Sequence, residues 1–229
     1  MSITRLSALV KSKNNIFLFF FFFFFNQKTA YEIGTGDWSS DVCSSDLFDL
    51  VDVGFLIGLG EAGAAIPSHA EVPDSARINA SNVWRLRCWD DASSLPVLVL
   101  SCPKLDQAHP DKHGELLRRM LPVLVACNKQ AARYGPRATV GVFWEYMSVP
   151  QVESRLSGVE YSESIDAAIR SLFAHPFTLV LCVRTPIPAG DYLNKLPYER
   201  RGDRLIEQRI ARIVKDPGCL HADSNIASI

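Results

Sequence analysis

Three nearly uninterrupted apolar runs constrain the fold of this chain more than any other feature. They read PVLVLS at 96–101, ATVGVFW at 138–144 and FTLVLCV at 177–183. A segment that is apolar at successive positions, rather than at every second one, is typical of a strand buried on both faces of a sheet. Such strands belong mainly to parallel sheets, whose faces are covered by the connecting helices.

An amphipathic segment follows each run, and its apolar residues recur at the three-to-four spacing of a helix. These segments occupy 115–134, 162–174 and 200–215. In the first, Pro122 is expected to kink the helix or to end its first part. In the second, Ser162 is a suitable N-cap. The alternating order predicts an α/β fold, with a parallel sheet in three layers and helices on both faces.

The segments on either side of this core are less regular. Residues 48–57 are apolar and could form a strand, whereas 58–81 is rich in Gly, Ala, Pro and Ser and is interpreted as a loop or linker. Residues 83–89 alternate weakly and could form an edge strand. We therefore expect a linker or irregular N-terminal extension at 48–82, the α/β domain at 83–220 and a tail at 221–229. The sheet is then expected to be incomplete at its C-terminal end.

The first 47 residues are expected to stand apart from the domain. The apolar run at 16–25 holds eight of the 13 phenylalanines, and it is shorter than the roughly 20 residues that a membrane span needs. Residues 26–47 resemble a translated sequencing-library adapter, in the blocks QKTAYEI at 27–33 and DWSSDVCSSDL at 37–47. We expect 1–47 to be an artefactual or disordered leader, which leaves 182 residues (229 minus 47), enough for one domain.

Charge and cysteine content narrow the class of protein. The chain has 24 basic and 25 acidic residues, a net charge of −1, so electrostatics give no reason to expect nucleic acid or an anionic membrane as a partner. The five cysteines after the leader are irregularly spaced: Cys88, Cys102, Cys127, Cys182 and Cys219. This pattern indicates reduced thiols in a cytoplasmic protein rather than a disulfide framework. No residue pattern identifies a cofactor.

Polar residues at the predicted carboxyl edge of the sheet are the candidates for a functional site. The loops at that edge are 102–114, 145–161 and 184–199, and open α/β sheets bind ligands there. The candidate ligand-binding residues are Ser101, Asp106, His109, Asp111, Ser148, Gln151, Tyr198 and Arg201. Glu145 and Glu207 are the candidate catalytic residues, because carboxyl groups in such loops can act as acids or bases.

Alternatives stay open for three of these residues. Glu145 could contact a ribose or act as an acid or base, or it could cap a turn or pair with Arg200 or Arg201. Glu207 could face the same cleft or lie on a solvated helix face. Arg201 could bind an anion near a helix start, or it could form a surface salt bridge.

Three local patterns suggest other chemistry, and each has a simpler explanation. Residues 58–63 form a GxGxxG pattern, but Pro67 leaves barely one turn for the helix that dinucleotide binding requires. His109 and His113 have the spacing of metal ligands on a helix, but a proline and a glycine in that loop argue against a helix there. Cys102 could be a nucleophile, but no His or Asn partner is identifiable. We therefore expect no metal site.

The motifs of these loops together carry a resemblance. A strand that ends in Ser before an HPD loop, FWEYxSxPQ at 143–151 and YxxRG at 198–202 resemble a group of uncharacterised eukaryotic α/β domains over 95–220. The pattern is more distantly similar to HET (heterokaryon-incompatibility) and TIR-like signalling domains. The chain departs from it in three places: Glu145 where Asp is usual, 102–105 in place of His-x-Trp-Leu, and Asp203-Arg204 in place of Trp-Cys.

The resemblance implies a flavodoxin-like or TIR-like sheet and one of three functions. The first is an intracellular signalling module that acts by self-association or by binding a protein partner. The second is a nucleotide-processing enzyme that hydrolyses an N-glycosidic bond, with Glu145 as the key carboxylate and Arg201 as an anion contact. The third is a truncated copy with no function of its own.

Overall fold

The computed structural model describes residues 47–78, 96–135, 138–150, 159–175, 178–215 and 226–228. All of them belong to the compact unit formed by Trp38–Ile229. The expected leader (apart from Leu47), the expected edge strand at 83–89, Gln151, Cys88 and Cys219 lie outside the described residues.

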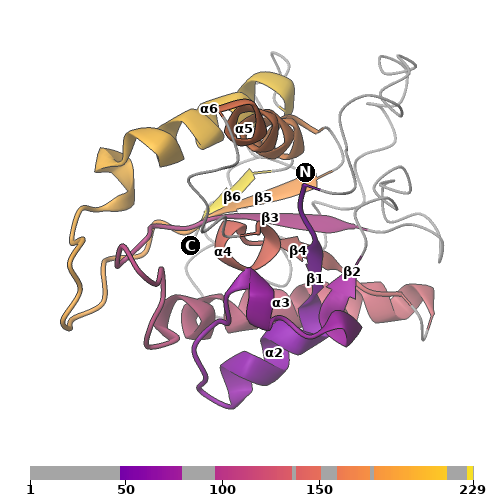
Figure 1. Ribbon diagram of the computed structural model, residues 1–229. Coiled ribbons are helices and arrows are strands. Elements are labelled where there is room, and N and C mark those ends of the chain that lie inside the picture. The colour runs from indigo at the N-terminus through magenta and orange to yellow at the C-terminus, as the bar shows by residue number, and fades with distance from the viewer. Residues whose placement is uncertain are drawn as a thin grey trace, which may run out of the picture. The chain divides into compact units, whose positions relative to one another are not determined.

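A six-stranded sheet forms the centre of this unit, in the order β2-β1-β4-β3-β5-β6 (Figure 1). The strands are β1 Leu50–Asp52, β2 Arg77–Ile78, β3 Val97–Ser101, β4 Gly141–Phe143, β5 Thr178–Cys182 and β6 Ile226–Ser228. Strands β4, β3, β5 and β6 are parallel, whereas β1 runs antiparallel to both β2 and β4. The three apolar runs are thus β3, β4 and β5 at the centre of the sheet, which confirms the predicted α/β class.

Helices cover both faces of the sheet (Figure 1). Helices α5 and α6 lie on one face, and α2 and α3 pack together on the other. The helices are α2 Val53–Glu61, α3 Glu115–Ala131, α4 Glu145–Ser148, α5 Val159–Ala174 and α6 Gly202–Lys215. Short 3₁₀ turns occupy His69–Glu71, Asp74–Ala76, Ala132–Tyr134 and Tyr198–Arg200. The arrangement has the three layers that the sequence predicted.

Helix α3 continues through Pro122, so of the two expected outcomes the helix does not end there. Two other predicted boundaries need correction. Helix α5 begins at Val159, so Ser162 is not its N-cap; apolar periodicity does not mark the first turn of a helix sharply. The expected loop at 145–161 begins with the short helix α4, because the Ser148 hydroxyl accepts a hydrogen bond from the Trp144 amide at 3.1 Å and closes a turn.

The N-terminal segment belongs to the domain, contrary to the linker interpretation. The predicted strand stops after three residues because the Asp52 carboxylate caps α2, accepting hydrogen bonds from the amides of Gly54 at 2.7 Å and Phe55 at 3.3 Å. Gly58 and Gly60 lie inside α2. The glycine pattern is therefore neither a linker nor a strand-to-helix phosphate turn.

The two ends of the described chain both add to the sheet. Val51 lies opposite Val142 in the antiparallel β1–β4 pair. At the other side, Cys182 lies opposite Ser228 in the parallel β5–β6 pair, where the sequence predicted a tail. A strand of three residues has too short a pattern to be recognised from the sequence.

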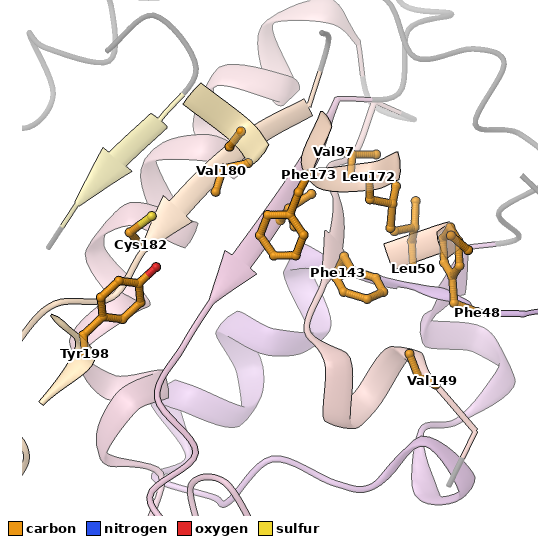
Figure 2. Close-up of a cluster of buried hydrophobic side chains, with 13 residues drawn as sticks. Phe48, Leu50, Val97, Phe143, Val149, Leu172, Phe173, Val180, Cys182 and Tyr198 are labelled. Carbon is orange, nitrogen blue, oxygen red and sulfur yellow. The ribbon is translucent and has the colours of Figure 1, made fainter. Parts of the chain in front are cut away.

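The core between the sheet and helices α5 and α6 fixes the position of the N-terminal segment (Figure 2). The Phe48 ring is 3% exposed and meets the Phe143 ring edge to face, with centroids 5.5 Å apart. Leu172 and Phe173 of α5 complete this part of the core. Burial of a large apolar side chain contributes about 2 kcal/mol, so Phe48 holds the start of β1 on the sheet.

Gly114, the residue before α3, lies against the segment that follows α2. Its φ is +65°, and a Cβ there would lie 2.6 Å from the backbone oxygen of Ala64, in the segment after α2. Only glycine fits this close approach without a shift of the backbone.

Among the described residues, no helix is long and apolar enough to cross a membrane. Cys102 and Cys127 are buried free thiols.

Candidate functional site

The order of the strands separates two connections at the carboxyl ends of β3 and β5. Strand β3 leads into α3 on one face of the sheet, and the neighbouring strand β5 leads into α6 on the other face (Figure 1). The connections therefore separate at this point, which is where open α/β sheets bind their ligands. Ser101 and Cys182, the last residues of the two strands, lie opposite each other in the register.

Arg204 of α6 is the centre of an ion-pair network at this edge of the sheet. The residue is only 4% exposed. Its Nη1 donates to Oε1 of Glu207 at 2.6 Å, and its Nη2 donates to Oε2 of Glu145 at 3.1 Å. Lys104 Nζ approaches the other Glu145 oxygen at 2.6 Å. One guanidinium thus holds both predicted catalytic carboxylates, and the partners of Glu145 are Lys104 and Arg204 rather than Arg200 or Arg201.

The pKa values of the two carboxyl groups are shifted in opposite directions. Burial alone would raise the pKa of Glu145, but the charges of Lys104 and Arg204 and the hydrogen bonds from both lower that pKa below its usual value. Burial raises the pKa of Glu207 above its usual value, and it outweighs the opposing effects of Arg204 and Ser101. When the environments of two carboxyl groups separate their pKa values in this way, an enzyme can use one group as the acid and the other as the base.

Two buried hydroxyl groups extend the network behind Glu207. The Ser101 hydroxyl lies 2.6 Å from Oε2 of Glu207 and 2.7 Å from the Tyr198 hydroxyl. Tyr198 also donates to the backbone oxygen of Arg204 at 3.2 Å. Ser101 is fully buried and Tyr198 is 1% exposed, and burial raises the pKa of the Tyr198 phenol well above its usual range. Ser101 and Tyr198, both predicted as site residues, are thus brought together here.

A recess open to solvent lies on the Glu145 side of Arg204. The recess is shallow: it has a volume of about 10 Å³, and about 240 Å³ when the open solvent at its mouth is included. Its lining combines charged groups with apolar and aromatic side chains: Leu100, Cys102, Lys104, Pro110, Trp144, Glu145, Tyr146 and Arg204. Burial raises the pKa of the Cys102 thiol well above its usual value, so this cysteine lacks the thiolate character of a nucleophile.

Arg201 does not lie in the recess lining, and its guanidinium donates hydrogen bonds to backbone carbonyl groups. Its Nε donates to the oxygen of Leu196 at 2.9 Å, its Nη1 to the oxygen of Lys104 at 2.7 Å and its Nη2 to the oxygen of Asn194 at 3.2 Å. All three partners are backbone carbonyl groups, in the loops after β3 and β5. Arg201 therefore joins two loops, and at 7% exposure it is not a surface residue; its role as an anion contact stays a prediction.

Asp111 and His109 stabilise the first loop and the start of α3. The Asp111 carboxylate accepts a hydrogen bond from the Leu117 amide at 2.9 Å; it therefore occupies the end of α3 where an anion would otherwise bind. His109 Nδ1 accepts from the Asp111 amide at 3.1 Å, so its Nε2 carries the proton and donates to the oxygen of Ile66 at 2.8 Å. These contacts hold the loop in place, although Oδ1 of Asp111 is buried without a hydrogen-bond partner among the described residues.

Asp106 and Ser148 also have structural partners. Asp106 accepts from the Ala108 amide at 3.3 Å and pairs with Lys112 at 3.3 Å. Ser148 is fully buried and closes the turn of α4. In the part of the chain that the structure describes, no group of three or more His, Cys, Asp or Glu side chains could hold a metal ion.

No family model, curated protein or solved structure matches the chain. The resemblance to HET and TIR-like domains therefore stays an expectation from the sequence.

Sequence reasoning missed Lys104 and Arg204 as members of the site. Arg204 and Glu207 are three positions apart on one helix, a spacing that brings opposite charges together. The spacing alone predicts an exposed pair. The spacing does not reveal that Arg204 is buried in the fold.

Proposed function

We propose that this domain binds a nucleotide-like ligand at the mouth of the recess, where Lys104 is displaced, and hydrolyses its N-glycosidic bond with Glu145 and Glu207. The observation that carries the proposal is the pair of carboxylates on the Arg204 guanidinium, with pKa values shifted in opposite directions. Their place at the carboxyl edge of a parallel sheet agrees with ligand binding in this class of fold. The choice of a nucleotide rests on the resemblance of the loop motifs.

Each carboxylate has a distinct role in this scheme. Glu145 is ionised and lines the recess, where it accepts a proton from the attacking water as that water bonds to the anomeric carbon. Glu207 does not line the recess, but its side chain is 15% exposed, so it supplies a proton to the leaving nitrogen through a water molecule as the carbon–nitrogen bond breaks. The proton count balances, because one proton leaves Glu207 and one arrives on Glu145.

Lys104 covers Glu145 until the ligand arrives. Its side chain is 49% exposed, and ion pairs at exposed positions contribute little free energy, typically below about 1 kcal/mol. A ligand can therefore displace Lys104 from the carboxylate at small cost. Arg204, at 5% side-chain exposure, stays in place and keeps Glu145 ionised.

The test is release of a free base from nucleosides, mononucleotides and dinucleotides, measured by chromatography, together with thermal stabilisation of the protein by each. Glu145→Gln and Glu207→Gln are each expected to reduce turnover by about 100-fold or more. Asp166→Asn is the matched control, because this carboxylate belongs to an exposed ion pair on α5. A folded protein that is stabilised by no nucleotide and releases no base would contradict the proposal.

A second candidate function is assembly with other copies of the chain. It is favoured by the exposure of three large apolar side chains, Leu193 at 77%, Leu196 at 50% and Ile206 at 57%, in the loop after β5 and on α6. Sedimentation of the protein over a range of concentrations tests it. Self-association that Leu193→Ser weakens would support this function, whereas a monomer at every concentration would exclude it.

A further inference from the structure

The ionised form of Glu207 is disfavoured by the burial of its carboxyl group. Glu207 must lose its proton during the reaction and regain one afterwards, so its ionised form must exist in a site that burial makes unfavourable. Its side chain is 15% exposed. The Arg204 guanidinium donates a hydrogen bond to one carboxylate oxygen, Oε1, at 2.6 Å and stabilises its negative charge. The other oxygen, Oε2, has the Ser101 hydroxyl at 2.6 Å.

The hydroxyl groups of Ser101 and Tyr198 can serve both protonation states. When Glu207 is ionised, Ser101 donates to Oε2, and Tyr198 can donate to Ser101. When Glu207 is protonated, Oε2 donates to Ser101, Ser101 donates to Tyr198, and Tyr198 donates to the backbone oxygen of Arg204. Apart from the proton on Glu207 itself, the two states differ only by rotation of hydroxyl hydrogens, so the heavy atoms need not move.

We propose that Ser101 and Tyr198 are positioning residues for Glu207: their hydroxyl groups hold its carboxyl in one orientation and stabilise its ionised form. The proton that Glu207 releases to a ligand is replaced from solvent water. The role of Glu207 as the acid rests on the proposed function, but its stabilisation by the two hydroxyl groups does not.

The direction of the effect follows from the groups around Glu207. A hydrogen bond donated to a carboxylate is stronger than one accepted from the neutral acid, so Ser101 on balance favours ionisation. Tyr198 strengthens this donation by donating in turn to Ser101. The titratable and charged groups that face this network come from several elements: Arg204 and Asp203 on α6, Glu145 on α4, Cys102 after β3, Cys182 on β5, and Arg184 after β5, which lies over the Tyr198 ring. Lys104 acts on it through Glu145.

The experiment is a pH titration of the ligand-free full chain by infrared difference spectroscopy. The C=O stretching band of protonated Glu207 is identified by its loss in Glu207→Gln. In Tyr198→Phe and Ser101→Ala, the pH midpoint of this band is expected to rise by about one unit, because each variant removes support for the carboxylate. A midpoint that is unchanged or lower in both folded variants overturns the proposal, as does a Glu207 that stays ionised throughout.

Ser101→Thr and Ser101→Val form a matched pair that separates the hydroxyl from the shape of the side chain. Both add a similar volume at a buried strand position, and β-branched residues suit strands. Only Ser101→Val is expected to raise the midpoint. An equal shift in both would show that packing, rather than the hydroxyl, controls Glu207. Because no ligand is present, these outcomes are independent of whether nucleotides are hydrolysed.

Discussion

The neighbouring residues Arg200 and Arg201 give a sharp test of the loop connection. Arg201 is 7% exposed and donates to three carbonyl groups, whereas Arg200 lies exposed on the adjacent 3₁₀ turn. We expect Arg201→Met to destabilise the domain and Arg200→Met to leave its free energy of unfolding nearly unchanged. Methionine keeps much of the apolar stem of arginine, so the comparison isolates the guanidinium.

The magnitude follows from the hydrogen bonds to Leu196, Lys104 and Asn194. Each intramolecular hydrogen bond contributes about 1 kcal/mol net, so the loss of three amounts to about 3 kcal/mol. Domains of this kind have a total stability of about 5–15 kcal/mol. The expected loss is therefore a large fraction of the whole, and it is well above the effect of an ordinary surface substitution.

Urea unfolding followed by circular dichroism measures the difference. The midpoint of Arg201→Met should move to lower urea with little change in the slope, because the surface exposed on unfolding stays similar. If Arg201→Met and Arg200→Met unfold within about 0.5 kcal/mol of each other, Arg201 does not join the loops as described.

Three further predictions concern the buried charges and the glycine contact. Arg204→Met leaves Glu145 and Glu207 without their shared cation and should cost about 3–5 kcal/mol in urea unfolding; an effect below about 1 kcal/mol contradicts the central role of Arg204. Because the pKa of Glu145 is lowered in the fold, wild type should gain stability over Glu145→Gln as pH rises through the acid range. Because the pKa of Glu207 is raised, Glu207→Gln should gain stability relative to wild type as pH rises above the usual carboxyl pKa and through the raised pKa of Glu207. Unfolding measured across pH checks both slopes, and equal slopes refute the assignment. Gly114→Ala brings a Cβ against the Ala64 oxygen and should lower stability by about 1–3 kcal/mol; no change in the melting temperature would show that the two segments are not in contact.

The centre of the fold could be predicted from the sequence, because a buried strand needs an apolar residue at nearly every position. Val97–Ser101, Gly141–Phe143 and Thr178–Cys182 are such strands. The N-terminal segment could not be predicted in the same way. Residues 48–57 are apolar throughout, and periodicity does not distinguish a strand from a buried helix in so short a run. The change from β1 to α2 depends on one side chain, Asp52.

The candidate site was predicted in part. Glu145, Glu207, Ser101 and Tyr198 do come together. The reason is that the parallel strands β4, β3 and β5 are neighbours, so their carboxyl ends lie at one edge of the sheet. The loop-joining role of Arg201 was missed because its partners are backbone carbonyl groups, which no side-chain pattern reveals.

The antiparallel strand β1 has a consequence for the order of folding events. Its partner residues lie far along the chain, with Val51 opposite Val142, whereas β3 and β4 are joined by a single helix. Loop closure costs more entropy as the loop lengthens, and long-range pairing slows folding. The β3–α3–β4 unit is therefore expected to form first, with β1 joining its edge later. Phe48 and Leu50 emerge from the ribosome before the surface that will cover them exists.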